Sequence, residues 1–163
     1  LGLVLLIYGI LLLVGVAAGG RDPWQPLRGA SFAANAAPAS QPLSFRRVKT
    51  VAEVEGAVRE AVGRPVMLDF YADWCASCKE LERETFADSG VRAALTGLVT
   101  LQADVTANDA ADRALLQRFG VIGPPAILFF GPDGQERRER RLVGFMAAGP
   151  FSAHLRSVLG RQN

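Results

Sequence analysis

The stretch that decides the fold is Pro65–Glu82, which reads PVMLDFYADWCASCKELE. Its first half, Val66–Tyr71, is an almost unbroken apolar run, and a short run of this kind predicts a β-strand that is buried on both faces. Cys75 and Cys78 follow at once, where the strand pattern gives way to the helical pattern of Lys79–Glu82. The sequence therefore predicts a strand, a short loop and a helix whose first turn carries two cysteines.

Two cysteines at the start of a helix favour redox chemistry. Helix geometry brings the two sulfurs within reach of each other, so a disulfide can form and open with little backbone motion. Unpaired N–H groups and the helix dipole favour the thiolate of Cys75, which is the nucleophile in thiol–disulfide exchange. We expect Cys75 at the exposed mouth of the helix and Cys78 one turn inside, where burial keeps its thiol protonated until needed.

Zinc binding is the alternative function of a C-x-x-C motif. A structural zinc site needs further ligands of the Cys or His type. The chain has no cysteine besides these two, and its one histidine, His154, falls on the last predicted helix. We therefore predict no metal, and we expect His154 on the surface of that helix.

Asp69 interrupts the apolar strand six residues before Cys75. Burying a carboxylate is costly, and desolvation should raise its pKa. In one interpretation Asp69 faces outward from an edge strand. In the other it accepts the proton of Cys78, which must be lost before that sulfur can resolve a mixed disulfide.

The remainder of residues 43–163 alternates strand and helix patterns. Thr50 and Glu53 have the spacing of a capping box, and Val51, Val54, Val58 and Val62 follow on one helical face. Gly123-Pro124-Pro125 precedes an apolar run, and we expect a cis bond before Pro125, with a tight trans turn as the alternative. The other strands are expected at 45–49 (an edge), 98–103, 126–130 and near Leu142, and the other helices near Asp88, after an Asn108 cap and from Pro150.

This order, β-α-β-α-β-α-β-β-α, predicts an α/β fold with a central mixed sheet flanked by helices. The run Arg137–Arg141 is expected to be a solvated hairpin edge.

A length of 163 residues suits one such domain with extra segments. The net charge of +2 is too small to indicate a nucleic-acid partner. Two cysteines that lie only three positions apart are too few and too close together for a disulfide scaffold.

The segment before the domain has two parts. Residues 1–18, LGLVLLIYGILLLVGVAA, carry no charge and are long enough for a transmembrane helix. A secretory signal or a buried core helix is the alternative, but no basic stretch or Met precedes the run. We expect a piece of a longer protein in which this is the last of several spans. Residues 19–42 have the Ala-, Gly-, Pro- and Ser-rich composition of a flexible linker.

The segment Tyr71–Lys79, YADWCASCK, resembles the active site of the thioredoxin superfamily. Within that superfamily the chain is most similar to the C-terminal periplasmic domain of the DsbD family of thiol:disulfide interchange proteins. The apolar N-terminus resembles the final helix of that family's membrane domain. The similar stretches cover most of residues 45–158 and comprise 65–82, 101–110, 127–130, 144–146 and 151–156.

The resemblance implies a thioredoxin fold and a role for each site residue. Cys75 would attack and Cys78 would resolve, with their disulfide as the redox group and no bound cofactor. Asp69 and Glu82 would be the acidic groups that hold the pKa values of the sulfurs up. For Glu82 a solvated charge on the helix is the alternative.

The resemblance also implies contacts and partners. Trp74 would contact the substrate, and Pro125 would occupy the cis-proline position that faces the disulfide. In this family the domain takes electrons from its own membrane domain and passes them to the N-terminal periplasmic domain of the same protein. The final acceptors are periplasmic disulfide isomerases and thioredoxins of cytochrome c maturation. The implied location is the bacterial inner membrane, with this domain in the periplasm.

Two other functions fit the same residues. One is an independent membrane-anchored thioredoxin-like reductase for cytochrome c maturation. The other is a binding module that uses the thioredoxin fold without redox activity. Such modules often lose a cysteine or the buried acid, whereas Cys75, Cys78 and Asp69 are all present. These residues therefore favour a redox enzyme over a binding module, and the direction of electron flow, toward reduction of protein disulfides, is what the resemblance implies.

Overall fold

The computed structural model describes residues 43–160, together with Gly2, Leu6, Tyr8 and Gly9, which are helical. The chain divides into two units, Leu1–Ala39 and Ser40–Asn163. Apart from those four positions, the predicted membrane span (1–18) and linker (19–42) lie outside the described residues and stay predictions. No helix among the described residues is long and apolar enough to cross a membrane.

The second unit has the predicted strands and helices, including the helix near Asp88, with two short helical turns added. Its strands are β1 (Arg46–Val48), β2 (Val66–Tyr71), β3 (Val99–Asp104), β4 (Ala126–Phe130) and β5 (Leu142–Val143). Its α-helices are α2 (Val51–Glu60), α3 (Ala76–Glu80), α4 (Ser89–Leu95), α5 (Ala110–Phe119) and α6 (Ala148–Val158). A π-helical turn, η1 (Leu81–Thr85), continues α3, and a 3-10 turn, η2 (Arg138–Arg140), precedes β5.

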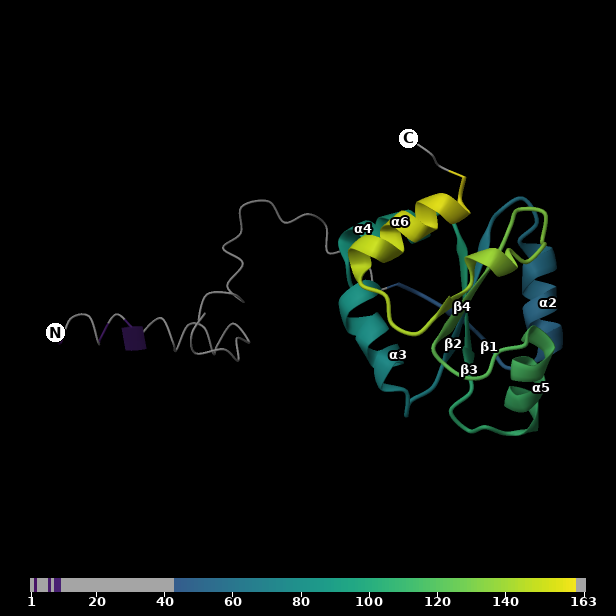
Figure 1. Cartoon of the computed structure of the whole chain (residues 1–163), viewed down its shortest axis with the longest axis horizontal. Helices are drawn as coiled ribbons and strands as arrows, with labels where there is room; N and C mark the ends of the chain where they lie inside the picture. Colours follow the sequence, from purple (N-terminus) through teal and green to yellow (C-terminus); the bar gives the residue numbers. More distant parts are fainter. Residues whose placement is uncertain (1, 3–5, 7, 10–42, 161–163) are drawn as a thin grey trace. The chain divides into compact units, whose positions relative to one another are not determined.

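The five strands form one mixed sheet in the order β1-β3-β2-β4-β5. The first three run parallel, and β4 pairs antiparallel with both β2 and β5. β2 is therefore central, and all six of its residues are buried, as the apolar run predicted. Helices α2 and α5 cover one face of the sheet, and α3, α4 and α6 cover the other (Figure 1).

Each face of the sheet has its own apolar core. On the α2 and α5 side, Phe119 packs edge-on against Phe70 and Phe130. On the α4 and α6 side, Phe151 packs edge-on against Phe86. The side chains of β2 alternate between these cores, as a pleated strand requires. Leu68 and Phe70 belong to the first core and Met67 to the second, so Asp69 points toward the layer that holds α3.

The structure corrects two details of the helix ends. The capping box of Thr50 and Glu53 is present, but α2 ends at Glu60, so Val62 lies beyond the helical face and is 69% exposed. The cap of α5 is Asp109 and not Asn108. Asp109 makes its own capping box with Asp112, whereas Asn108 turns the chain with a φ of +48°.

The prediction for Arg137–Arg141 is wrong in part. Residues 138–140 form a 3-10 turn rather than a hairpin edge. The side chain of Arg141 is only 22% exposed, because it forms an ion pair with the largely buried carboxylate of Glu136. A charge-rich sequence pattern does not reveal this ion pair, which depends on the bridge between Phe130 and Glu136.

Candidate active site

The two cysteines join the end of the central strand to α3. Cys75 is the N-cap of α3 and forms a disulfide with Cys78, with their Cα atoms 5.3 Å apart. The backbone N–H of Cys78 donates to Cys75 Sγ at 3.1 Å. When the disulfide is open, this N–H is placed to stabilise a thiolate on Cys75, because charge-assisted hydrogen bonds favour the ionised form. The geometry thus supports Cys75 as the more nucleophilic sulfur.

The exposure of the two cysteines differs less than expected. Cys75 is 7% exposed and Cys78 is 3% exposed. The expectation of an openly exposed Cys75 is therefore wrong for the disulfide state. Both residues belong to the same apolar cluster as Tyr71 and Ala72, which lie at the end of β2 and directly after it. Because so little of Cys75 is exposed, a partner must contact the surrounding loops for its disulfide to reach this sulfur.

Asp69 is buried in the central strand, with 3% of its surface exposed. This excludes the outward-facing position on an edge strand. Its Oδ2 accepts a hydrogen bond from Gln102 Nε2 at 2.8 Å, and the two residues are direct partners in the β2–β3 register. Burial raises the pKa of Asp69 to about 7, with a further increase from the charge of Glu82, while the Gln102 hydrogen bond and the charge of Arg47 act to lower it. A carboxyl with this pKa can both hold and release a proton near neutral pH.

Glu82 lies on the exposed side of η1, as the solvated alternative expected. Its side chain is 42% exposed, and Oε2 lies 4.0 Å from Lys79 Nζ. Its charge still reaches the site, because it contributes to the raised pKa of Asp69. Glu82 can therefore influence the Asp69 carboxyl through its charge.

Trp74 and Pro125 occupy the same end of the sheet as the cysteines. The indole of Trp74 is 63% exposed, directly before Cys75 in the chain. The Pro124–Pro125 bond is cis, which confirms the expectation. Pro125 is buried and precedes Ala126, the partner of Phe70 near the end of β2. Its carbonyl accepts a hydrogen bond from Gly144 N at 3.0 Å, which ties the proline to the segment after β5.

Sequence reasoning missed two polar residues at the site. Gln102 is 2% exposed, and in the described part of the chain it is the only residue whose side chain hydrogen-bonds to that of Asp69. An amide in the otherwise apolar run Leu101–Ala103 was the available signal, since parallel pairing places it beside the buried acid. Thr106 contacts both Asp73 and Trp74, and no sequence pattern marked it.

No metal ligand set was found in the region that the structure describes. No group of three or more His, Cys, Asp or Glu side chains gathers there in a metal-binding arrangement. His154 is half-buried rather than fully on the surface. Its Nε2 lies 2.8 Å from the carbonyl oxygen of Arg140, and its ring packs at 5.6 Å from that of Phe129.

Comparison with curated proteins identifies the relatives of this chain. A family model of the thioredoxin-like domain matches residues 52–159. The thiol:disulfide interchange protein DsbD of Ralstonia nicotianae is 59% identical over 98% of this chain and 26% of that protein. DsbD of Escherichia coli K12 is 53% identical over 81% of this chain and 24% of that protein. The chain thus spans about a quarter of the length of these relatives.

Solved structures agree with this assignment. The C-terminal domain of Neisseria meningitidis DsbD in its oxidised form has a TM-score of 0.53 and 38% identity, over 63% of this chain and 86% of that one. The same domain has also been solved in a reduced form. A thioredoxin from Thermus thermophilus has a TM-score of 0.55 and 28% identity, over 72% of this chain and 88% of that one. The chain therefore belongs to the thioredoxin-like family and, within that family, to the C-terminal domains of DsbD.

Proposed function

We propose that this chain is a protein-disulfide reductase that works by dithiol–disulfide exchange at Cys75 and Cys78. The observation that carries the proposal is the Cys75–Cys78 disulfide at the N-terminus of α3. It lies shortly after the end of the central strand β2, in which Asp69 is buried. The oxidised and reduced structures of the Neisseria meningitidis relative support a site that opens and closes.

The exchange has two steps with balanced electrons. The Cys75 thiolate attacks one sulfur of the partner's disulfide, whose other sulfur leaves as a thiolate, and a mixed disulfide forms. Cys78 then loses its proton to the Asp69 carboxylate and attacks the Cys75 sulfur. The Cys75–Cys78 disulfide forms and the partner leaves as a dithiol. The chain is oxidised by two electrons and the partner is reduced by two.

The surrounding residues have supporting roles in this proposal. Asp69 is the proton acceptor, and burial keeps the pKa of its carboxyl high, with a smaller contribution from the charge of Glu82. Pro125 and Trp74 flank the sulfurs where the partner backbone lies. Pairing of an extended partner segment with exposed backbone groups is a common mode of peptide recognition.

The wider relay rests on the resemblance to DsbD. In it, the membrane domain of a longer protein supplies electrons, residues 1–18 are its last span, and residues 19–42 tether this domain on the periplasmic side of the inner membrane. The acceptor is the N-terminal periplasmic domain of the same protein, which passes the electrons on to periplasmic disulfide isomerases and cytochrome c maturation thioredoxins. No bound cofactor enters either step.

Reduction of insulin by residues 43–163, with dithiothreitol as the electron source, separates a reductase from a binding module. We expect the wild type to shorten the lag before the insulin B chain precipitates, and Cys75→Ser to match dithiothreitol alone. Ser77→Ala is the matched control, because it lies between the cysteines and leaves both sulfurs in place. A wild type that is no faster than dithiothreitol alone would contradict the proposal.

A further inference from the structure

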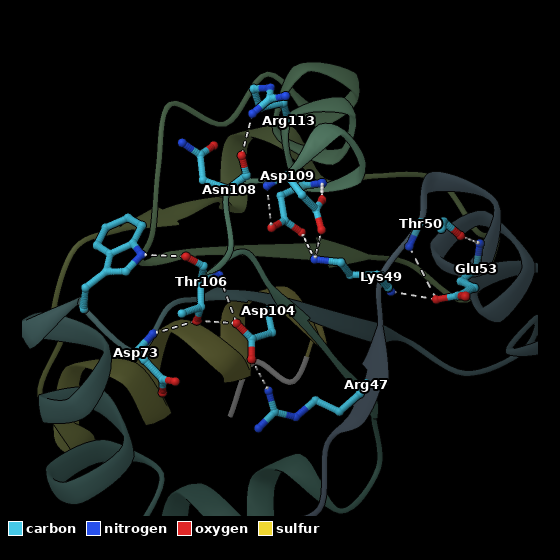
Figure 2. Close-up of polar contacts among 12 residues, drawn as sticks. Arg47, Lys49, Thr50, Glu53, Asp73, Asp104, Thr106, Asn108, Asp109 and Arg113 are labelled. Atoms are coloured by element: carbon cyan, nitrogen blue, oxygen red, sulfur yellow. Dashed lines mark hydrogen bonds and ion pairs between the residues drawn. The ribbon is translucent and has the colours of Figure 1, made fainter.

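The loop that follows β3 holds the two residues that precede Cys75. The backbone N–H of Asp73 donates to Thr106 Oγ1 at 2.9 Å, and the indole N–H of Trp74 donates to the Thr106 carbonyl at 3.1 Å. Figure 2 shows both hydrogen bonds meeting at this one residue. Thr106 thus fixes a backbone position and a side-chain orientation at once.

Thr106 is itself anchored. Its hydroxyl donates to Asp104 Oδ1, which also accepts from the Thr106 backbone N–H at 3.0 Å. Asp104 Oδ2 accepts from Arg47 Nη1 of β1 at 3.1 Å (Figure 2). A continuous set of contacts therefore runs from β1 to the loop before the cysteines. The Thr106 hydroxyl is its central link, because it accepts from Asp73 and donates to Asp104.

Trp74 is the exposed end of these contacts. Large aromatic side chains that stay exposed beside a reactive group are typical of contact surfaces. An indole whose N–H is already bound has fewer orientations to lose when a partner arrives. Preorganisation of this kind increases affinity by reducing the entropy lost on binding.

We propose that Thr106 is a positioning residue that orients Trp74 for a protein partner and takes no part in the sulfur chemistry. Its hydrogen bonds go to Asp73, Trp74 and Asp104 rather than to a cysteine. The inference rests on the proposed function, since it concerns how the same site engages a protein disulfide. A small disulfide, which needs no contact with Trp74, should react without help from Thr106.

The rates of exchange with a large and a small disulfide test this division. The substrates are the oxidised N-terminal periplasmic domain of Ralstonia nicotianae DsbD and bis(2-hydroxyethyl) disulfide, each mixed with the reduced chain. Thr106→Val keeps the carbonyl that binds the indole but loses the two hydroxyl contacts, with Asp73 and Asp104, that hold this carbonyl in place. It should lower the second-order rate constant for the protein roughly three- to tenfold, the range of one or two lost hydrogen bonds. The rate constant for the small disulfide should be unchanged, and Thr106→Ser should restore the protein rate.

Thr100→Val is the matched control, because Thr100 lies on β3, the strand directly before the loop of Thr106, and donates its hydroxyl to Ser44 O, away from the loop before the cysteines. It should leave both rate constants unchanged. If Thr106→Val keeps the wild-type rate with the protein, or loses rate equally with both substrates, the inference is wrong.

The environment of Trp74 gives a second measurement that needs no partner. Trp24→Phe leaves Trp74 as the single tryptophan of the full chain. Acrylamide should then quench its fluorescence more strongly in Thr106→Val than in the background or in Thr100→Val. A wild type that reduces only the small disulfide would overturn the proposed function, and the quenching would still decide whether Thr106 holds Trp74. Equal quenching in all variants would overturn the inference.

Discussion

Cys78→Ser is expected to accumulate a covalent adduct with an oxidised protein partner, in nearly stoichiometric amount. Cys75 can still attack, because the backbone N–H of Cys78 that points at its sulfur is unchanged by the substitution. The second step is lost, because no other thiol in the chain can release the mixed disulfide. A non-reducing gel after mixing with the oxidised N-terminal periplasmic domain should show the adduct, and a reductant should remove it.

The reciprocal variant is the control for this prediction. Cys75→Ser should trap little partner, because its remaining sulfur belongs to Cys78, which is 3% exposed and lies inside the first turn of α3. Ser77→Ala keeps both sulfurs and should show only the transient adduct of the wild type. Equal trapping by Cys75→Ser and Cys78→Ser would show that the nucleophile is assigned wrongly.

Asp69→Asn is expected to change the stability of the domain in a pH-dependent way. The carboxyl has its pKa raised from 3.8 to about 7, mainly by burial. The folded state therefore keeps a proton that the unfolded state releases, so wild-type stability falls as the pH rises from about 4 to about 7. Asn cannot ionise, and the variant should be more stable than the wild type above pH 7, by on the order of 4 kcal/mol. Urea unfolding at pH 4, 6 and 8 measures the difference.

The same substitution should slow the release of the partner. Asp69 must be ionised to accept the Cys78 proton, so the wild-type rate of mixed-disulfide resolution should rise with pH through about 7. In Asp69→Asn this rise should disappear, and the rate at pH 8 should fall about a hundredfold, the low end for loss of a general base. Parallel stability curves and equal release rates for the two proteins would mean that Asp69 neither titrates nor accepts the proton.

The fold was predictable where local and long-range signals agreed. The run Val66–Tyr71 is apolar at every position but Asp69, and it became the central strand with neighbours on both sides. Thr50 and Glu53 cap α2 with each other, which needs no tertiary contact. The cap of α5 was harder, because Asn108 and Asp109 both suit an N-cap and only the turn geometry places Asp109 there.

The candidate site was predictable where its residues are marked by their neighbours in the sequence. The spacing of Cys75 and Cys78 fixes their disulfide, and the apolar neighbours of Asp69 indicate its burial. The contributions of Gln102 and Thr106 depend on which residues the sheet and its loops bring beside them, 33 positions along the chain in the case of Asp69 and Gln102. A single sequence contains no local pattern for such pairs.

A thiol count during one turnover tests most directly the claim that Cys75 and Cys78 exchange electrons with a protein partner. The reduced chain and the oxidised N-terminal periplasmic domain are mixed, quenched with acid at intervals, alkylated and weighed by mass spectrometry. The account predicts that the wild-type chain loses both thiols as the partner gains two, at the same rate, and that Cys75→Ser transfers nothing. A wild-type chain that keeps both thiols, or a Cys75→Ser variant that reduces the partner equally fast, would contradict it.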